Sequence, residues 1–327
     1  MFAIEVENLT KEFDGFVAVD SISFSIGKGE IFGLLGPNGA GKTTTMSMLS
    51  TTLKPTSGKA YVNGFDILKN EDDVRKSIGI VFQDQSLDEE LTAYENMDFH
   101  GRLYRVPKEE RQKKIAELLK LVELEDKKDN LVKTYSGGMR RRLEIARGLL
   151  HEPDVLFLDE PTLGLDPQTR NHLWDYIEKL NGEKGITLIL TTHYMDEADK
   201  LCNRVAIIDR GKIIASDTPE KLKDSIGGDV ITIHSPQRDD LYEIIKDQTW
   251  VKHLDLHDSS LTISLQNAGQ HVAEIVNLSS EKGISIDDIS IHKPTLEDVF
   301  LHYTGRTIRE EEANTKDRMR MIQRVRR

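Results

Sequence analysis

The stretch GPNGAGKTT, Gly36 to Thr44, constrains the fold more than any other part of the chain. It matches G-x-x-x-x-G-K-[ST], follows the apolar run IFGLL and precedes a helical stretch, which is the context of a phosphate-binding P-loop. Its glycines allow backbone N–H groups to surround phosphates, Lys42 adds a positive charge, and the Thr43 hydroxyl can bind Mg²⁺. The alternative interpretation is a glycine turn with an incidental lysine. No G-x-G-x-x-G is present, so a dinucleotide-binding fold has no support.

Apolar runs elsewhere in the chain predict the sheet around this loop. EIFGLL, IGIVF, VLFL, TLILTT and RVAII are short and continuous, which is typical of strands buried on both faces of a parallel sheet. The first quarter alternates instead, with Ile4 and Val6 on one face and Ile22, Phe24 and Ile26 on another. We therefore expect an α/β layer structure with an antiparallel β subdomain.

Between about residues 87 and 150 the strand pattern stops. Thr92 and Glu95 have the spacing of a helix capping box, and a helical apolar stripe follows at Ile115, Leu118, Leu119 and Val122. This predicts an α-helical subdomain inserted into the α/β core.

The chain after about residue 225 has a different pattern. From Asp229 the order is strand, helix, strand, strand, helix, strand, which is the ferredoxin-like order, and PTLEDVFLHYTG adds a final helix. We expect a nucleotide-binding domain at 1–225, a small α+β C-terminal domain at 226–305 and a charged tail at 306–327. The tail carries eight Lys/Arg and four Asp/Glu without an apolar stripe, which favours a solvated or disordered segment.

Composition narrows the kind of protein. The net charge of −12 argues against nucleic acid as the main partner, and the apolar runs are far shorter than the roughly 18 residues of a membrane span. The start of the chain has no signal-peptide pattern. A single cysteine, Cys202, excludes an internal disulfide, and we expect it to be buried. These observations together predict a cytosolic chain.

VLFLDEP, Val155 to Pro161, is a buried strand that ends in two carboxylates. In a P-loop enzyme the first acid, Asp159, belongs to the Mg²⁺ shell. The second acid, Glu160, lies where it can polarise an attacking water molecule. The alternative is a strand end with a solvated acidic pair.

TYSGGMRRR, Thr134 to Arg142, predicts a second anion-binding helix start, because Ser136, Gly137 and Gly138 lead directly into a helical pattern. The arginines at 140–142 are unusual there, since the helix dipole disfavours cations by roughly 0.3–1 kcal/mol. They form either a solvated basic surface or a group close to a bound nucleotide.

These motifs resemble, in order and spacing, those of the ATP-binding cassette (ABC) ATPases over about residues 1–222. The resemblance implies ATP and Mg²⁺ as cofactors. It places around the phosphates Gly36, Pro37, Asn38, Gly39, Ala40, Gly41, Lys42, Thr43 and Thr44.

The resemblance also implies roles outside the P-loop. Phe13 would stack on adenine, for roughly 1–3 kcal/mol, although a strand-end core phenylalanine is the alternative. Gln83 would contact Mg²⁺ and His193 the γ-phosphate, with Gln85 as a near neighbour of Gln83. Asp166 would connect two active sites across a dimer of cassettes.

Residues 135–139, the signature segment, would bind the ATP of another cassette through Ser136, Gly137 and Gly138. Tyr135 and Met139 stand where the family usually has Leu and Gln. The chain has one P-loop and one signature segment, so the resemblance implies pairing with a second copy or a related cassette.

Two further resemblances narrow the class. KPTLEDVFLHYTG and LDEPTLGLDPQTR are similar to segments of the daunorubicin-resistance-type exporter ATPases, whose partners are ABC-2-type membrane permeases. We therefore expect an exporter ATPase subunit, peripheral on the inner face of the cell membrane, in which residues 229–304 support dimer contacts or permease coupling. The alternatives are a regulatory, repair or translation-type ABC ATPase; the repair type would carry long heptads and the translation type a second P-loop, and neither is present.

Overall fold

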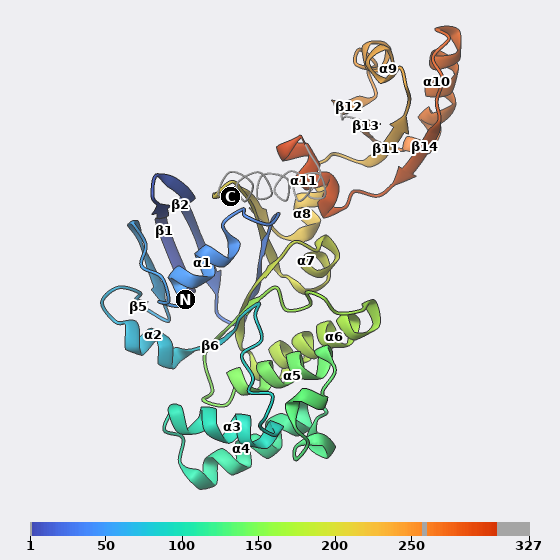
Figure 1. Ribbon diagram of the computed structural model, residues 1–327. Helices are drawn as coiled ribbons and strands as arrows, with labels where there is room; N and C mark the ends of the chain where they lie inside the picture. The colour runs from blue at the N-terminus through green and yellow to red at the C-terminus, as the bar shows by residue number, and fades with distance from the viewer. Residues whose placement is uncertain (1, 257–259, 306–327) are drawn as a thin grey trace, which may run out of the picture. The chain divides into compact units, whose positions relative to one another are not determined.

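The computed structural model describes residues 2–256 and 260–305 (Figure 1). The chain divides into two compact units, Met1–Ile214 and a second unit that begins at Ala215. The predicted boundary near residue 225 and the roles of the two parts stay predictions, and the predicted tail at 306–327 lies outside the described residues. None of the helices in the described part of the chain combines the length and apolar character that a bilayer crossing needs.

The first unit is built on a six-stranded sheet in the order β10-β9-β3-β8-β7-β6. Neighbouring strands from β9 to β6 pair in parallel, and β3, β7 and β8 are buried along their whole length, as continuous apolar runs predict. The strands are β3 (Ile31–Leu35), β6 (Ile78–Val81), β7 (Val155–Asp159), β8 (Thr187–Thr192), β9 (Arg204–Asp209) and β10 (Lys212–Asp217).

A four-stranded antiparallel sheet, in the order β2-β1-β4-β5, lies beside α1 (Figure 1). Its alternating strands bury Ile4, Val6, Ile22 and Ile26 in one core with residues of α1 and the larger sheet, as predicted. Its elements are β1 (Phe2–Phe13), β2 (Phe16–Gly27), β4 (Ser57–Val62) and β5 (Phe65–Asp66), and the two helices that follow β3 and β5 are α1 (Lys42–Leu49) and α2 (Glu71–Ser77).

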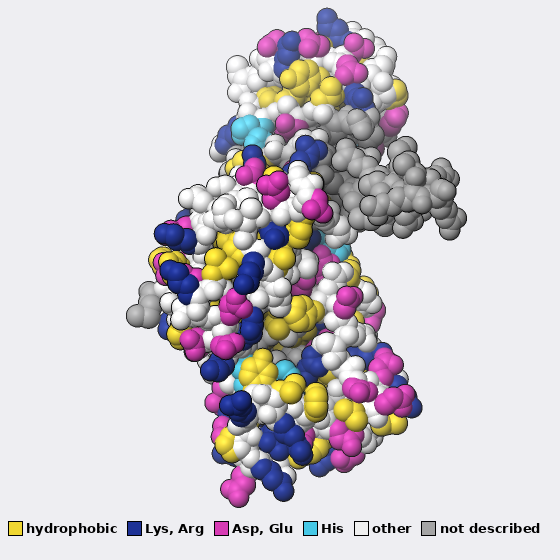
Figure 2. All heavy atoms as spheres, turned by 60° about the vertical axis from the view of Figure 1, so that its left-hand side comes forward, with side chains coloured by type: hydrophobic (Ala, Val, Ile, Leu, Met, Phe, Trp, Pro, Cys, Tyr) yellow, Lys and Arg dark blue, Asp and Glu magenta, His cyan; other side chains and the backbone are white. Residues whose placement is uncertain are grey.

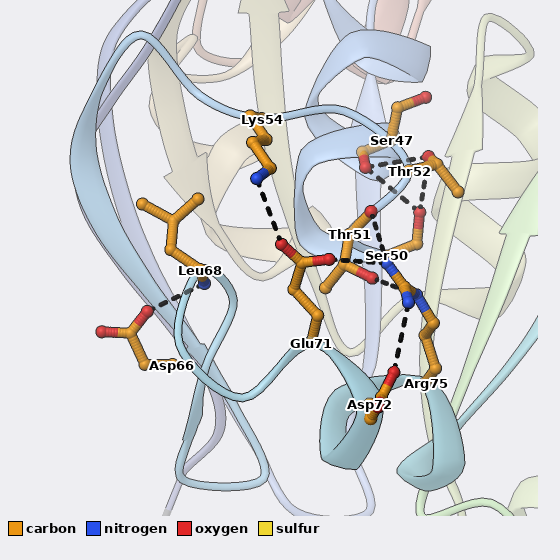
Figure 3. A network of polar contacts seen from close by, with 10 residues as sticks. All are labelled: Ser47, Ser50, Thr51, Thr52, Lys54, Asp66, Leu68, Glu71, Asp72 and Arg75. Carbon is orange, nitrogen blue, oxygen red and sulfur yellow. Dashed lines mark hydrogen bonds and ion pairs between the residues drawn. The ribbon is translucent and has the colours of Figure 1, made fainter.

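Helix α2 is joined to the C-terminal end of α1 by Arg75 (Figure 3). Its guanidinium donates to the hydroxyl of Thr51 at 2.9 Å and pairs with Glu71 at 2.8 Å and Asp72 at 3.3 Å. Glu71 also faces Lys54 at 3.6 Å. Exposed pairs of this kind contribute little energy each, so the network mainly fixes the turn after the helix that carries the P-loop lysine.

The predicted helical subdomain is confirmed. It contains α3 (Ala93–Leu103), α4 (Lys108–Leu121) and α5 (Gly137–Gly148), with the short turns η1 (Glu125–Lys127) and η2 (Val132–Thr134) between them. The capping box is present, since Thr92 accepts from the Glu95 N–H at 3.1 Å and Glu95 accepts from the Thr92 N–H at 2.8 Å. The predicted apolar stripe of α4 is buried.

Two histidines pack together where α3 and α5 end. The ring of Tyr104 stacks on His151 at 3.8 Å between centroids, and His100 lies 6.0 Å from His151. Burial, with the charges of Arg147 and His151, lowers the pKa of His100 to about 3. His100 is therefore a neutral part of this packing.

Helices α6 (Pro167–Lys184) and α7 (Met195–Leu201) meet at a buried polar pair. The indole N–H of Trp174 donates to a carboxylate oxygen of Glu197 at 3.0 Å. Burial raises the pKa of Glu197, although hydrogen bonds from Thr192 and Thr162 oppose the rise.

Cys202 follows α7 and is buried, as predicted. A Cβ atom added at Gly33 of β3 would lie 2.7 Å from its sulfur, so the thiol fills the space that a larger residue at 33 would need. Burial, together with the charges of Glu197 and Glu30, raises the pKa of the thiol well above its ordinary value.

The second unit has the predicted order of strands and helices. Its sheet, in the order β12-β13-β11-β14, is antiparallel throughout, and α9 and α10 contribute to its core. The ferredoxin-like designation stays a prediction drawn from this order. The elements are α8 (Pro219–Asp224), β11 (Asp229–His234), α9 (Arg238–Ile245), β12 (Val251–Leu256), β13 (Ser260–Leu265), α10 (Ala268–Glu281), β14 (Asp288–His292) and α11 (Leu296–Thr304).

The predicted final helix, α11, begins with a capping box between Thr295 and Asp298. It buries Leu296, Val299 and Phe300, which agrees with an amphipathic helix that closes the small unit. Charged side chains of both signs are scattered among uncharged and apolar ones on the face of the molecule in Figure 2, so the acidic excess is not a single patch there.

Candidate functional site

The P-loop turns tightly between β3 and α1, and two of its glycines, Gly36 and Gly41, have no room for a side chain. A Cβ atom at Gly36 would lie 2.1 Å from the carbonyl oxygen of Ile208 in β9. Gly41 has φ +105° and lies against β2, since a Cβ atom there would lie 2.6 Å from the carbonyl oxygen of Ala18. The loop is therefore held against the sheet, and its exposed residues are Asn38, Gly39 and Thr43.

Lys42, Glu160 and His193 lie together at the end of this loop. The Lys42 ammonium is buried and donates to the carbonyl oxygens of Gly36 at 2.7 Å and Pro37 at 3.1 Å. It also lies 3.3 Å from Oε1 of Glu160, whose Oε2 lies 3.0 Å from Nδ1 of His193. Two cationic or proton-bearing groups thus share one buried carboxylate, and a solvated acidic pair at the strand end is excluded.

The carboxylate of Glu160 is fixed by its backbone as well as by its neighbours. The residue has φ +46°, in the left-handed region, and its N–H donates to the hydroxyl of Thr191 at 3.0 Å. Burial favours the neutral acid, but the neighbouring His193 and the charge of Lys42 outweigh it and hold the pKa of Glu160 below its ordinary value. Glu160 is therefore ionised at neutral pH and can accept a proton.

Thr43 and Asp159 form a second polar group beside Glu160. The Thr43 hydroxyl donates to Oδ1 of Asp159 at 3.2 Å, and the Thr191 hydroxyl donates to the same oxygen at 2.5 Å. Hydroxyl and carboxylate oxygens are ligands that Mg²⁺ prefers. Within the described residues no three His, Cys, Asp or Glu side chains form a metal cluster, and Mg²⁺ in nucleotide sites takes its other ligands from phosphates and water. The pair fits such an ion.

Phe13 and Gln83 are predicted site residues that take no part in the contacts described so far. Phe13 ends β1 and is 42% exposed, with the Lys11 ammonium 4.9 Å from its ring centroid, so the buried-core alternative is wrong. Gln83 lies in an exposed segment after β6. Contacts of Phe13 with adenine and of Gln83 with Mg²⁺ stay predictions.

The signature segment begins α5. Ser136 is the N-cap residue, and its hydroxyl accepts from the Met139 N–H at 3.3 Å. Tyr135 is buried, and its hydroxyl donates to the carbonyl oxygen of Lys127 at 2.6 Å, so it anchors the segment to the helical subdomain. A cavity of about 220 Å³ adjoins it, lined by Glu123, Ser136, Gly138, Met139, Arg142, Thr169, His172 and Leu173.

Gly138 connects the signature segment to α6. A Cβ atom at Gly138 would lie 2.2 Å from the methyl group of Thr169. Thr169 is in turn held by Asp166, the N-cap of α6, which accepts from the Thr169 N–H at 3.0 Å and its hydroxyl at 2.6 Å. These hydrogen bonds lower the pKa of Asp166.

The three arginines differ in their surroundings. Arg140 pairs with Glu89 at 2.5 Å, and Arg142 with Glu123 at 3.2 Å, both near the surface. Arg141 is buried, so the solvated-surface interpretation is wrong for it.

Two residues that take part in the site, Thr169 and Thr191, were not predicted from the sequence, and neither were the contacts of Arg141. Thr191 carried a usable signal, because Thr191 and Thr192 are polar residues that end a buried strand immediately before His193. The contacts of Arg141 and Thr169 depend on segments far away in the sequence.

Comparisons with known proteins agree with this geometry. A family model described as ABC transporter matches residues 19–163, and one described as ATP-binding protein DrrA1-3-like, C-terminal domain, matches residues 218–304. The chain is 40% identical to the linearmycin resistance ATP-binding protein LnrL of Bacillus subtilis (strain 168), over 94% of this chain and 100% of that protein. It is 41% identical to the daunorubicin/doxorubicin resistance ATP-binding protein DrrA of Streptomyces peucetius, over 93% and 92%.

A solved structure is also similar. The ATP-binding cassette MJ0796, a dimer in a post-hydrolysis state bound to ADP and Pi, aligns with a TM-score of 0.60 and 30% identity. The alignment covers 66% of this chain and 98% of that one.

Proposed function

Because the chain belongs to the ABC transporter family, as an ATP-hydrolysing subunit of an exporter, we propose that it powers export through a separate ABC-2-type permease. The mechanism rests on one observation, the buried group of Lys42, Glu160 and His193. In this group Lys42 and His193 flank the ionised carboxylate of Glu160. Two relatives over most of the chain are resistance ATP-binding proteins, which supports export as the direction.

The proposed roles follow from the contacts. The P-loop backbone and Lys42 bind the phosphates of ATP, and Phe13 stacks on the base. Thr43 and Asp159, with Gln83, hold Mg²⁺, which neutralises charge on the β- and γ-phosphate oxygens when bound. Glu160 accepts the proton of the attacking water, and His193 keeps that carboxylate oriented at 3.0 Å.

A second cassette completes the proposed site. The signature segment opens onto a cavity whose lining residues include none from the P-loop, so Ser136 and the P-loop face different surroundings in the described chain. We propose that Ser136, Gly137 and Gly138 bind the γ-phosphate of ATP held by another copy or a related cassette. ATP then closes the pair and hydrolysis reopens it, as a ligand-biased two-state switch. Asp166 connects the two sites.

Glu160→Gln tests the proposed base. The variant keeps the shape of the side chain but cannot accept the proton, so it should bind ATP, hydrolyse it at least roughly a hundredfold more slowly, and accumulate as an ATP-locked dimer. Size-exclusion chromatography with light scattering, in ATP and in ADP, measures the dimer. Lys42→Ala is the companion and should lose nucleotide binding. Near-normal turnover by Glu160→Gln would contradict the assignment.

The proposed location is the inner face of the cell membrane, reached through the permease.

A mixed dimer tests the shared site, because Ser136→Ala in one copy should damage hydrolysis at the P-loop of the other. Pairing Ser136→Ala with a Lys42→Ala copy leaves either one intact composite site or none, depending on which chain supplies the signature segment. We expect the mixed dimer to turn over faster than either homodimer. If Ser136→Ala homodimers are impaired and the mixed dimer is no faster than the Lys42→Ala homodimer, sharing between chains is refuted.

A further inference from the structure

Every N–H group of the Arg141 guanidinium donates a hydrogen bond. Nε donates to the carbonyl oxygen of Pro161 at 2.9 Å, and Nη1 donates to that of Phe82 at 2.6 Å and to Glu144 at 3.0 Å. Nη2 donates to the carbonyl oxygens of Asp159 at 2.7 Å and Glu160 at 3.3 Å. An arginine has five N–H donors in a rigid fork, so this buried side chain is fully hydrogen-bonded.

These bonds join three separate segments. Arg141 belongs to the first turns of α5, which the signature segment begins. Its acceptors are three consecutive carbonyl groups at the end of β7 and the carbonyl group that precedes Gln83. Glu144, one turn later on α5, balances the charge and also accepts from the Ser86 N–H at 2.8 Å, so it attaches the segment after β6 to α5 as well.

The backbone of Glu160 is therefore held from both sides. Its N–H is bound to Thr191 of β8, and its carbonyl oxygen is bound to Arg141 of α5. A residue at φ +46° is in a costly conformation that the surrounding structure has to maintain. Without Arg141 the peptide groups on either side of Glu160 would lose their common donor, and the direction of the carboxylate would depend on Lys42 and His193 alone.

We propose that Arg141 is a positioning residue that sets the direction of the Glu160 carboxylate and links it to the signature helix. When α5 shifts on contact with a second cassette, Arg141 carries the shift to the backbone of Glu160 and to the carbonyl group of Phe82, next to Gln83. The inference rests on the proposed roles of Glu160 and the signature segment. It adds a route, within one chain, by which the surface that meets the second cassette adjusts that chain's own hydrolysis site.

Arg141→Lys tests the geometry of the fork. Lysine keeps the charge beside Glu144 but is a point donor that cannot span three consecutive carbonyl groups. Misplacing a reacting group by about 1 Å costs roughly a hundredfold in rate, so kcat should fall by roughly tenfold to a hundredfold. The Kd for ATP, measured by fluorescent-nucleotide titration, should be unchanged. Arg102→Lys is the matched control, because Arg102 is an exposed arginine of α3 that pairs with Asp98 at 2.7 Å, and its kcat should stay at the wild-type value.

The double variant Arg141→Gln/Glu144→Gln is the second test of the same position. It removes both charges of the Arg141–Glu144 pair together, so neither partner is left behind as an unpaired buried charge. The same fall in kcat is expected. An unchanged kcat in either variant, or an equal loss of ATP binding in both, would overturn the proposal.

Combining Arg141→Lys with Glu160→Gln separates positioning from a general structural role. If Arg141 acts through Glu160, the substitution should lower kcat in the wild-type background and have almost no effect in the Glu160→Gln background. Equal fold-losses in both backgrounds would overturn the inference while leaving the proposed function intact. If Glu160→Gln alone retained turnover, the proposed base would fail instead, so the two failures are distinguishable.

Discussion

Gly137 and Gly138 are adjacent glycines that should respond oppositely to the same added methyl group. Neither has a left-handed φ, so alanine is compatible with both backbones. The difference is space. A Cβ atom at 137 meets Leu165 at 3.5 Å, an ordinary contact, whereas one at 138 meets the methyl group of Thr169 at 2.2 Å. Thr169 cannot turn freely, because Asp166 binds both its N–H and its hydroxyl.

The cost can be worked out as a difference between the two variants. Replacing glycine by alanine in a helix gains at most about 1 kcal/mol, and this gain applies to both positions. Overpacking at Gly138→Ala costs about 1–3 kcal/mol in addition. The free energy of unfolding should therefore be about 1–3 kcal/mol lower for Gly138→Ala than for Gly137→Ala. At about 2–4 °C per kcal/mol for a unit of this size, the melting temperatures should differ by roughly 2–12 °C.

Calorimetry or urea unfolding of the two variants measures this difference directly. Steady-state ATPase activity should also fall further in Gly138→Ala, since displacing Thr169 moves the signature segment and Asp166, while ATP binding at the P-loop of the same chain should be kept. Indistinguishable unfolding midpoints would refute the reasoning, because they would mean that Thr169 gives way at no cost.

Three further outcomes are expected. Tyr135→Phe removes the hydrogen bond to Lys127 and should destabilise the protein by about 1 kcal/mol in urea unfolding, with ATP hydrolysis retained; an unchanged midpoint would contradict the anchoring role. Because the pKa of His100 is about 3 in the folded protein and near 6.5 when unfolded, stability should be full above pH 6.5 and should fall steadily as the pH drops from there toward 3. His100→Gln should flatten that pH profile, and a profile identical to the wild type would count against a buried neutral histidine. Trp174→Phe leaves buried Glu197 short of a donor and should cost about 1–3 kcal/mol by the same unfolding measurement, whereas a neutral effect would show that the pair does not contribute.

The parts of the site that could be predicted from the sequence are those whose chemistry lies within one short segment. The P-loop, the carboxylates after β7 and the serine at the start of α5 each depend on a handful of adjacent residues. The contact between Glu160 and His193 was also within reach, since both residues follow neighbouring parallel strands and the carboxyl ends of such strands meet.

The parts that could not be predicted depend on contacts between distant segments. Arg141 stands beside two surface arginines in the sequence, and its burial is decided by carbonyl groups at 82 and at 159–161. Strand β4 was missed for a similar reason. Its first three residues are exposed, so its apolar pattern is short, and it is a strand because it pairs with β1.

The buried thiol of Cys202 has a practical consequence for studying the assembly. It is the one cysteine of the sequence, it is packed against Gly33, and its raised pKa leaves little reactive thiolate. The natural chain should therefore react little with thiol-specific reagents, and Cys202 need not be replaced before labelling. A cysteine introduced at Asn38 in one copy and at Ser136 in another would be the reactive pair, so a cross-link between them would report directly on how two copies face each other.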